Sequence, residues 1–206
     1  KIKKGDKVAI MLPNLLTFPI SFFGSINIGA TVVNVNPLFK SREVKILLTD
    51  SNVETIVILD KFLNELESVL EETKIKNVIV CRPFDLLNIP MNLIVRTLLF
   101  FKTKSHKINS NFILFSDIVR CKEKNPSVSL SGNDVALLQY TGGTTGKSKA
   151  AILTHSNLVS NIAQLQLWVD NILSEGRETI ITALPMYHIF SLTVNLLFFY
   201  KIGSKN

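Results

Sequence analysis

Four short apolar runs follow one another at even spacing in the first eighty residues. They are VAIML at 8–12, TVVNV at 31–35, TIVIL at 55–59 and NVIVC at 77–81. Continuous apolar runs of about five residues are typical of strands that are buried on both faces, and helix-sized segments separate these four. The alternation predicts an α/β fold, with layered, mainly parallel sheets flanked by helices.

The segments between the runs carry helix signals. Asn14 is expected to cap a helix that runs to Asn27, and Ser41 is expected to cap a second helix with Glu43 in its first turn. A third helix is expected over residues 61–73, where apolar residues recur on one side.

The second half of the chain continues the pattern after an irregular stretch. VALLQY at 135–140 and TIITALP at 179–185 are predicted strands, and AAILTH at 150–155 also has strand character. Ser156 is expected to cap a helix with an apolar stripe.

Composition excludes several classes of protein. Apolar residues make up 47% of the 206 residues, far more than a disordered chain carries, and two cysteines cannot form a disulfide scaffold. Cys81 and Cys121 are expected to be free, buried thiols in a reducing compartment. The charge-free stretches 8–39 and 180–200 are interrupted by Pro and Asn, so a membrane span is not expected. The net charge is +7, and no nucleic-acid partner is expected.

The most informative segment is YTGGTTGKSKAAILTH at 140–155, a glycine- and threonine-rich loop with two lysines after a predicted strand. Glycine allows close approach of the backbone to a ligand, and successive backbone N–H groups can bind an anion. Hydroxyls and lysine add hydrogen bonds and charge for phosphate oxygens. The loop therefore predicts a polyphosphate site, and an ordinary surface loop is the alternative.

Gly146-Lys147-Ser148 also invites comparison with the Walker A loop of P-loop phosphotransferases. That motif places a glycine five positions before the second glycine, where this chain has Thr141. A helix should start immediately after a Walker loop, but the sequence there has strand character. In the P-loop alternative, Lys147 would be the lysine that contacts the phosphates.

Three motifs resemble those of the adenylate-forming enzymes, which include the acyl-CoA synthetases. They are YTGGTTG..K....LTH, the LPMYHIF segment at 184–190, and an upstream pair formed by GDKVAIMLPN and VVNVNPLFKSREV. The sequence is most similar to the N-terminal part of bacterial long-chain fatty-acid–CoA ligases. The resemblance implies that 1–206 is an incomplete N-terminal AMP-binding domain of the acyl-CoA synthetase fold, without the C-terminal domain.

The resemblance implies a function and a set of site residues. The complete protein would convert a long-chain fatty acid to acyl-adenylate with ATP and Mg²⁺, and then to acyl-CoA with CoA. Lys149 and His188 are the implied catalytic residues, and Tyr187 and His188 would contact the acyl substrate. Thr144 is the implied Mg²⁺ contact. The implied contacts to the ATP phosphates are Thr141, Gly142, Gly143, Thr144, Thr145, Gly146 and Lys149.

Two features qualify this interpretation. Ala150 stands where such enzymes usually have glycine, and if the backbone there needed a positive φ, alanine would cost about 1 kcal/mol. The alternative function is therefore a non-catalytic remnant of a ligase that at most binds nucleotide. Residues 86–107 combine an apolar stretch with a basic cluster, which is typical of peripheral contact with the inner face of the membrane by a cytoplasmic protein. An ordinary surface helix whose apolar face packs on the sheet is the alternative.

Overall fold

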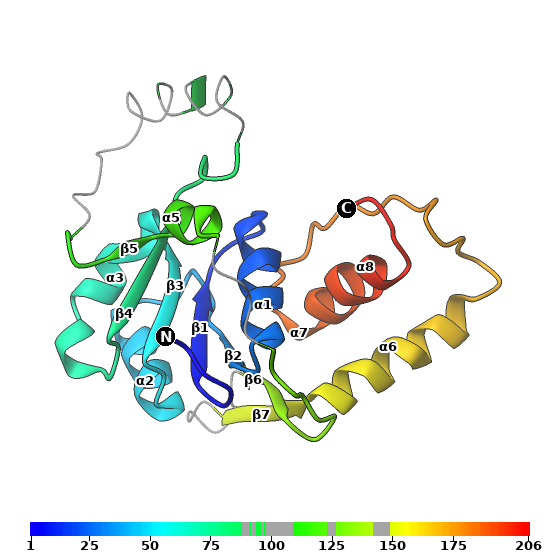
Figure 1. Cartoon of the computed structure of the whole chain (residues 1–206), viewed down its shortest axis with the longest axis horizontal. Coiled ribbons are helices and arrows are strands. Elements are labelled where there is room, and N and C mark those ends of the chain that lie inside the picture. The colour runs from blue at the N-terminus through cyan, green and yellow to red at the C-terminus, as the bar shows by residue number, and fades with distance from the viewer. Residues whose placement is uncertain (88–90, 92–93, 96, 98–108, 123–126, 142–148) are drawn as a thin grey trace.

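The computed structural model describes the chain except for residues 88–90, 92–93, 96, 98–108, 123–126 and 142–148 (Figure 1). The described strands form one seven-stranded sheet in the order β5-β4-β3-β1-β2-β6-β7. All neighbouring pairs are parallel except β6 and β7, which are antiparallel. The predicted mainly parallel α/β fold is thus confirmed. The strands are β1 (Lys7–Met11), β2 (Thr31–Asn34), β3 (Thr55–Leu59), β4 (Asn77–Cys81), β5 (Ile113–Leu114), β6 (Val135–Thr141) and β7 (Lys149–Thr154).

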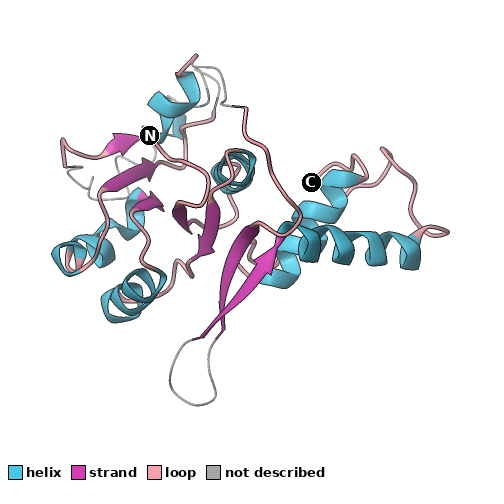
Figure 2. Cartoon of the chain, turned by 60° about the horizontal axis from the view of Figure 1, so that its bottom comes forward, coloured by secondary structure: helices cyan, strands magenta, loops and turns pink. Residues whose placement is uncertain are grey.

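Helices cover both faces of the sheet, as the two views of the chain show (Figures 1 and 2). The α-helices are α1 (Thr17–Asn27), α2 (Ser41–Ser51), α3 (Leu63–Glu67), α5 (Phe115–Arg120), α6 (His155–Val169), α7 (Ile189–Ser191) and α8 (Phe199–Lys201). Two 3₁₀ turns, η1 (Asp60–Phe62) and η2 (Leu70–Glu72), flank α3, and a π-helical stretch, η3 (Leu192–Phe198), joins α7 to α8.

Alternate residues of β1 point to opposite faces and divide the core in two. Ile10 packs with Phe18 and Phe22 of α1, whereas Met11 packs with residues of α2 and α3 on the other face. Each fully buried side chain of this size stabilises the fold by about 1.5–3 kcal/mol. The strands are therefore fixed from both sides, which holds their carboxyl ends in place.

The predicted helix caps at Asn14, Ser41 and Ser156 are wrong. Helix α1 begins only at Thr17, and Asn14 forms its hydrogen bonds with a distant segment. Ser41 is already inside α2, and its hydroxyl donates to Glu65. Thr154 caps α6 instead of Ser156, because its Oγ1 accepts the N–H of Asn157.

Two predicted elements also differ from the structure. Residues 61–73 break into η1, α3 and η2, because packing of Leu63 and Leu66 on the sheet overrides the helical period. Residues 179–185 form no strand of the sheet. Their backbone forms one isolated β-bridge, Thr179–Lys205. A strand needs a hydrogen-bonded partner along its length, so these residues do not join the sheet.

Both cysteines are free, as predicted, but only Cys81 is buried. Cys121 is exposed, because it follows the end of α5 at the surface. Within the described ranges, no helix is both long enough and apolar enough to cross a bilayer. Most of the predicted membrane-contact stretch at 86–107 lies outside the described residues.

Candidate functional site

The predicted phosphate loop joins β6 to β7, which form a hairpin at one edge of the sheet (Figure 2). The hairpin ladder runs as far as the pair Thr141–Lys149, and the Thr141 hydroxyl donates to the Lys149 carbonyl at 3.5 Å. Both residues are exposed, and Lys149 forms no ion pair within the described part of the chain. A hydroxyl and a cation thus stand opposite each other at the base of the loop, a combination that suits phosphate oxygens.

The loop residues between this pair lie outside the described residues. They are Gly142, Gly143, Thr144, Thr145, Gly146, Lys147 and Ser148. The predicted phosphate contacts of five of them, and the Mg²⁺ contact of Thr144, therefore remain predictions. Elsewhere in the described chain there is no group of three or more His, Cys, Asp or Glu residues that could hold a metal ion.

Tyr140 fixes the hairpin to helix α2. Its hydroxyl donates to Asp50 Oδ2 at 2.5 Å across ninety positions of sequence. Partial burial, followed by the hydrogen bond to the Asp50 carboxylate, raises the pKa of Tyr140 above its ordinary value. Tyr140 therefore stays protonated and continues to donate to Asp50 at neutral pH.

Ala150 lies inside β7 opposite Tyr140, and its side chain packs against the core on the α2 side of the sheet. Among the described non-glycine residues only Asn52 has a positive φ, so the backbone at Ala150 does not need glycine.

The length of strand β7 argues against the P-loop alternative. Six residues of β7 come before α6, whereas a Walker loop runs directly into a helix.

The LPMYHIF segment places Tyr187 half-buried and His188 exposed. His188 occupies the N-cap position of α7, where its Nδ1 accepts the N–H of Phe190 at 3.4 Å. In a neutral imidazole the nitrogen that accepts carries no proton, so the proton is on Nε2. The ring can therefore donate a hydrogen bond from Nε2 to an oxygen of a bound substrate.

A part-buried hydrogen bond joins the histidine segment to the hairpin. Gln139, only 8% exposed, donates from Nε2 to the Tyr187 carbonyl at 3.2 Å. Its Oε1 accepts from Asn34 Nδ2 at 3.2 Å, at the carboxyl end of β2. Gln139 lies two positions before Thr141, and Tyr187, whose carbonyl it contacts, directly precedes His188. The structure thus brings the phosphate-loop motif and the LPMYHIF motif together.

Asn14 holds the same segment from the carboxyl end of β1. Its Nδ2 donates to the carbonyls of Thr182 and Leu184 at 2.9 and 2.8 Å, and its Oδ1 accepts the N–H of Met186 at 2.8 Å. Sequence reasoning missed Asn14 and Gln139 as site residues. The only signal was a polar amide at, or just beyond, the end of an otherwise apolar strand.

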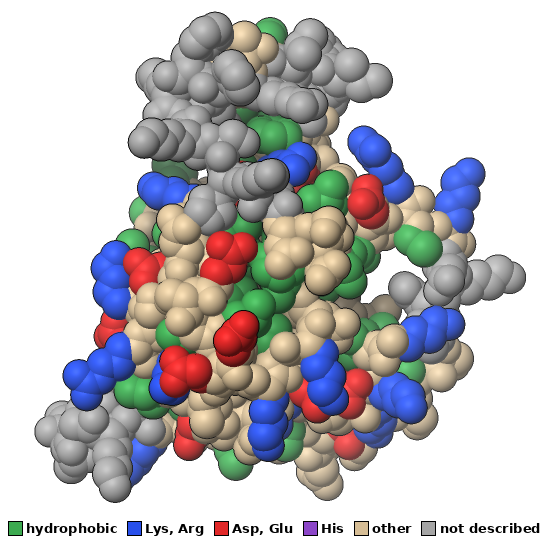
Figure 3. Space-filling model, turned by 90° about the vertical axis from the view of Figure 1, so that its left-hand side faces the viewer, with side chains coloured by type: hydrophobic (Ala, Val, Ile, Leu, Met, Phe, Trp, Pro, Cys, Tyr) green, Lys and Arg blue, Asp and Glu red, His purple; other side chains and the backbone are tan. Residues whose placement is uncertain are grey.

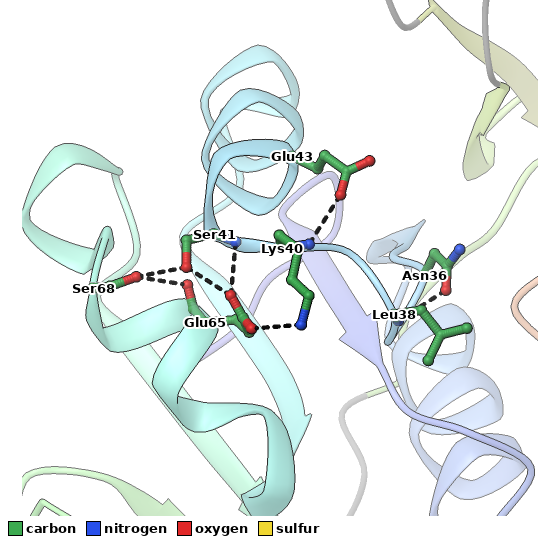
Figure 4. Close-up of polar contacts among 7 residues, drawn as sticks. All are labelled: Asn36, Leu38, Lys40, Ser41, Glu43, Glu65 and Ser68. Atoms are coloured by element: carbon green, nitrogen blue, oxygen red, sulfur yellow. Dashed lines mark hydrogen bonds and ion pairs between the residues drawn. The ribbon is translucent and has the colours of Figure 1, made fainter.

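The upstream NPLFKSRE motif has a structural explanation in the turn that leads into α2 (Figure 4). Asn36 Oδ1 accepts the N–H of Leu38, and Glu43 accepts the N–H of Lys40. Glu65 on α3 accepts from the N–H and hydroxyl of Ser41 and from Lys40 Nζ. These hydrogen bonds, that of the Ser41 hydroxyl first, lower the pKa of Glu65 below its ordinary value. On this side of the molecule acidic and basic side chains lie among one another (Figure 3).

A cavity of about 1190 Å³ opens between α1 and the segment that Asn14 holds. Its wall includes Ile20 and Phe23 of α1, and it also includes Met186, but not Tyr187 or His188. His155 also lines it, and its Nε2 is buried without a hydrogen-bond partner in the described chain. The main-chain N–H of His155 donates to the Asp134 carbonyl.

Comparison with known proteins was made for the whole sequence. A family model described as AMP-binding enzyme matches residues 1–206. The long-chain-fatty-acid–CoA ligase of Salmonella typhimurium is 40% identical over the entire chain, which covers 37% of that relative. 4-Coumarate–CoA ligase 3 of Arabidopsis thaliana is 30% identical over 95% of the chain, which covers 31% of it.

Solved structures give the same picture. A long-chain-fatty-acid-CoA ligase from Archaeoglobus fulgidus superimposes with a TM-score of 0.75 at 29% identity, over 99% of this chain and 35% of the other. An anthranilate CoA ligase in complex with anthranoyl-AMP has a TM-score of 0.77 at 22% identity, which supports the fold alone. The chain spans little more than a third of the length of the relatives it matches.

Proposed function

This chain belongs to the AMP-binding enzyme family, and we propose that it forms the N-terminal part of a long-chain fatty-acid–CoA ligase. The observation that carries the proposal is the contact between the two motifs. The Gln139 side chain links the hairpin that ends in Thr141 and Lys149 to the segment that carries His188. A site for phosphate oxygens and a site for an acyl oxygen are thereby neighbours, as a reaction between ATP and a carboxylate requires.

The proposed chemistry has two steps. A carboxylate oxygen of the fatty acid attacks the α-phosphorus of ATP, the α–β phosphoanhydride bond breaks, and pyrophosphate leaves. The thiolate of CoA then attacks the acyl carbon, and AMP leaves as the thioester forms. The first step concentrates negative charge on the phosphates, which cations and hydrogen-bond donors stabilise.

Within this chemistry the residues of the chain have distinct roles. Lys149 and Thr141 bind oxygens of the β- and γ-phosphates at the base of the loop. Loop residues 142–146 would add backbone N–H groups and hydroxyls, and Thr144 would help to hold the Mg²⁺ that accompanies ATP. His188 donates from Nε2 to an oxygen of the acyl-adenylate, and Tyr187 lines the acyl site beside it.

The proposal treats residues 1–206 as an incomplete AMP-binding domain, to which a longer polypeptide adds the remaining functional groups. The alternative is a non-catalytic remnant of such a ligase that at most binds nucleotide. The strained-loop argument for that alternative does not apply, because Ala150 lies in a regular strand.

A turnover measurement distinguishes the ligase from the non-catalytic remnant. A polypeptide that carries this sequence together with the region corresponding to the rest of the relatives should form AMP and acyl-CoA from ATP, CoA and palmitate. The 206 residues alone should form neither. If the longer polypeptide binds ATP but forms no acyl-adenylate with any long-chain acid, the ligase proposal is wrong and the remnant is correct.

Peripheral membrane contact through residues 86–107 belongs to the same proposal, since a long-chain fatty acid partitions into the bilayer. Each lysine near an anionic surface contributes about 1 kcal/mol to binding. Replacing Lys102, Lys104 and Lys107 by Gln should therefore weaken co-sedimentation with anionic vesicles and leave the weak binding to neutral vesicles unchanged. Binding that ignores both lipid charge and these substitutions would contradict the membrane contact.

A further inference from the structure

The segment from Thr182 to His188 has no regular secondary structure, and the side chains of Asn14 and Gln139, distant in sequence, form hydrogen bonds with its backbone. We propose that Asn14 and Gln139 are positioning residues, which set the location of Tyr187 and His188 relative to the phosphate hairpin. This inference rests on the proposed function, because it concerns the geometry of the same site. It assigns a role to two residues that contact neither phosphate nor acyl group in the proposed chemistry.

Asn14 uses its whole amide for this purpose. Both donated bonds go to carbonyls of the segment, Thr182 and Leu184, and the accepted bond comes from the N–H of Met186. The three partners are spread over five consecutive positions, so one side chain fixes the path of the backbone that leads to His188. Ser191 strengthens the arrangement, because its hydroxyl donates to the same Leu184 carbonyl at 2.8 Å.

Gln139 supplies the connection to the hairpin. It is 8% exposed and its partner Asn34 is 3% exposed, so the two amides form a buried pair between β6 and β2. Gln139 Oε1 accepts in this pair, and its Nε2 donates to the Tyr187 carbonyl. A shift of β6 is thereby transmitted directly to the residue before His188, since buried hydrogen bonds leave little freedom between their partners.

The two amides act on opposite ends of one short segment. Asn14 holds Thr182 to Met186 from β1, and Gln139 holds Tyr187 from β6. Strands β1 and β6 flank β2 in the sheet. Gln139 lies within β6, and Asn14 follows the end of β1 by three residues, so both attachment points lie near the carboxyl ends of these two strands.

Conservative substitutions test the proposal in the catalytically complete protein. Gln139→Glu keeps an oxygen for Asn34 but places a carboxylate oxygen against the Tyr187 carbonyl, so the link to the segment is lost and a charge is buried. Asn14→Asp keeps the acceptor for Met186 and loses both donated bonds. Each variant should lower kcat for adenylate formation by about 10- to 100-fold and leave KM for ATP nearly unchanged, because misplacement of reacting groups by about 1 Å has effects of this size.

Matched controls separate position from charge and from stability. Asn36→Asp and Gln166→Glu introduce the same changes outside the segment and should leave kcat unchanged. If Gln139→Glu does not give folded protein in a thermal melt, Gln139→Leu replaces it, with the same expected loss of kcat. A loss of kcat that the controls share would overturn the positioning role.

A double-mutant cycle with His188→Ala provides the decisive readout. If Gln139 acts through His188, Gln139→Glu should change kcat by less than about 3-fold once His188 is already alanine. Full additivity would show that Gln139 supports the fold in general, and would overturn the proposal. If Lys149→Ala and His188→Ala both leave adenylate formation intact, the proposed function itself is wrong. If they abolish it while Asn14→Asp and Gln139→Glu do not affect it, only the positioning role is wrong.

Discussion

At the scale of single residues, Asn14 and Gln139 link the segment before His188 to the sheet through their side-chain amides. Lys149, Tyr187 and His188 were implied as site residues by the family resemblance of the motifs that contain them. Asn14 and Gln139 were not, because an amide near the end of a strand can serve as a cap, a turn residue or a buried link. Which of these roles an amide takes depends on which distant part of the backbone folds against it. The hydrogen bonds of Asn14 to residues 182–186 are an example.

Ala150 provides a prediction at this scale. Its backbone is that of a strand paired with Tyr140, so glycine would remove packing without relieving strain. We expect Ala150→Gly to lower the free energy of unfolding by about 0.5–1 kcal/mol, because glycine loses more conformational freedom on folding. KM for ATP should not change. A several-fold lower KM for ATP in the glycine variant, measured beside a melt of both proteins, would contradict this account of the loop.

At the scale of elements, the buried strands were predictable to within about one residue, because five apolar residues in a row have few other places in a fold. The helix boundaries were less predictable than the strands. Residues 179–185 have the same composition as the true strands yet form one bridge only, since strand formation depends on a partner that the sequence of the segment does not encode. The antiparallel direction of β7 follows from the short hairpin connection.

The turn into α2 yields a pH prediction. Hydrogen bonds from Ser41 and Lys40 lower the pKa of Glu65 below its ordinary value of 4.5, so the folded state favours the charged form. Its contribution to stability is present above the ordinary pKa and is lost as the pH falls through the lowered value. In urea titrations from pH 7 to acid, Glu65→Gln should therefore lose less stability than the unmodified protein.

The control for this experiment is Glu71→Gln, which removes an exposed carboxylate from η2. It should follow the unmodified protein through the whole pH range. Identical acid profiles for Glu65→Gln and the unmodified protein would show that the cluster around Ser41 does not stabilise the turn, and that the NPLFKSRE motif needs another explanation.

At the scale of the whole molecule, one sheet collects motifs that lie far apart in the sequence. Asn14 after β1 and Gln139 in β6 bond to the segment around Tyr187, and Asn34 at the end of β2 bonds to Gln139. Ligand sites in open parallel sheets usually lie at the carboxyl ends of the strands. The order of the strands could not be derived from the apolar runs alone. The family resemblance implied the acyl-CoA synthetase fold but no strand order, and the superposition on a ligase at a TM-score of 0.75 agrees with that fold.

The central claim is that the hairpin between β6 and β7 binds the phosphates of ATP through Lys149 for formation of an acyl-adenylate. The most direct measurement compares both half-reactions in Lys149→Ala and Lys147→Ala variants of the catalytically complete protein. Lys149→Ala should slow adenylate formation about 100-fold or more, a typical effect of removing a group that stabilises developing charge, and should slow thioester formation from supplied acyl-adenylate far less. Lys147→Ala should have little effect on either step. Equal losses in both half-reactions for Lys149→Ala, or a dominant effect of Lys147→Ala, would contradict the account.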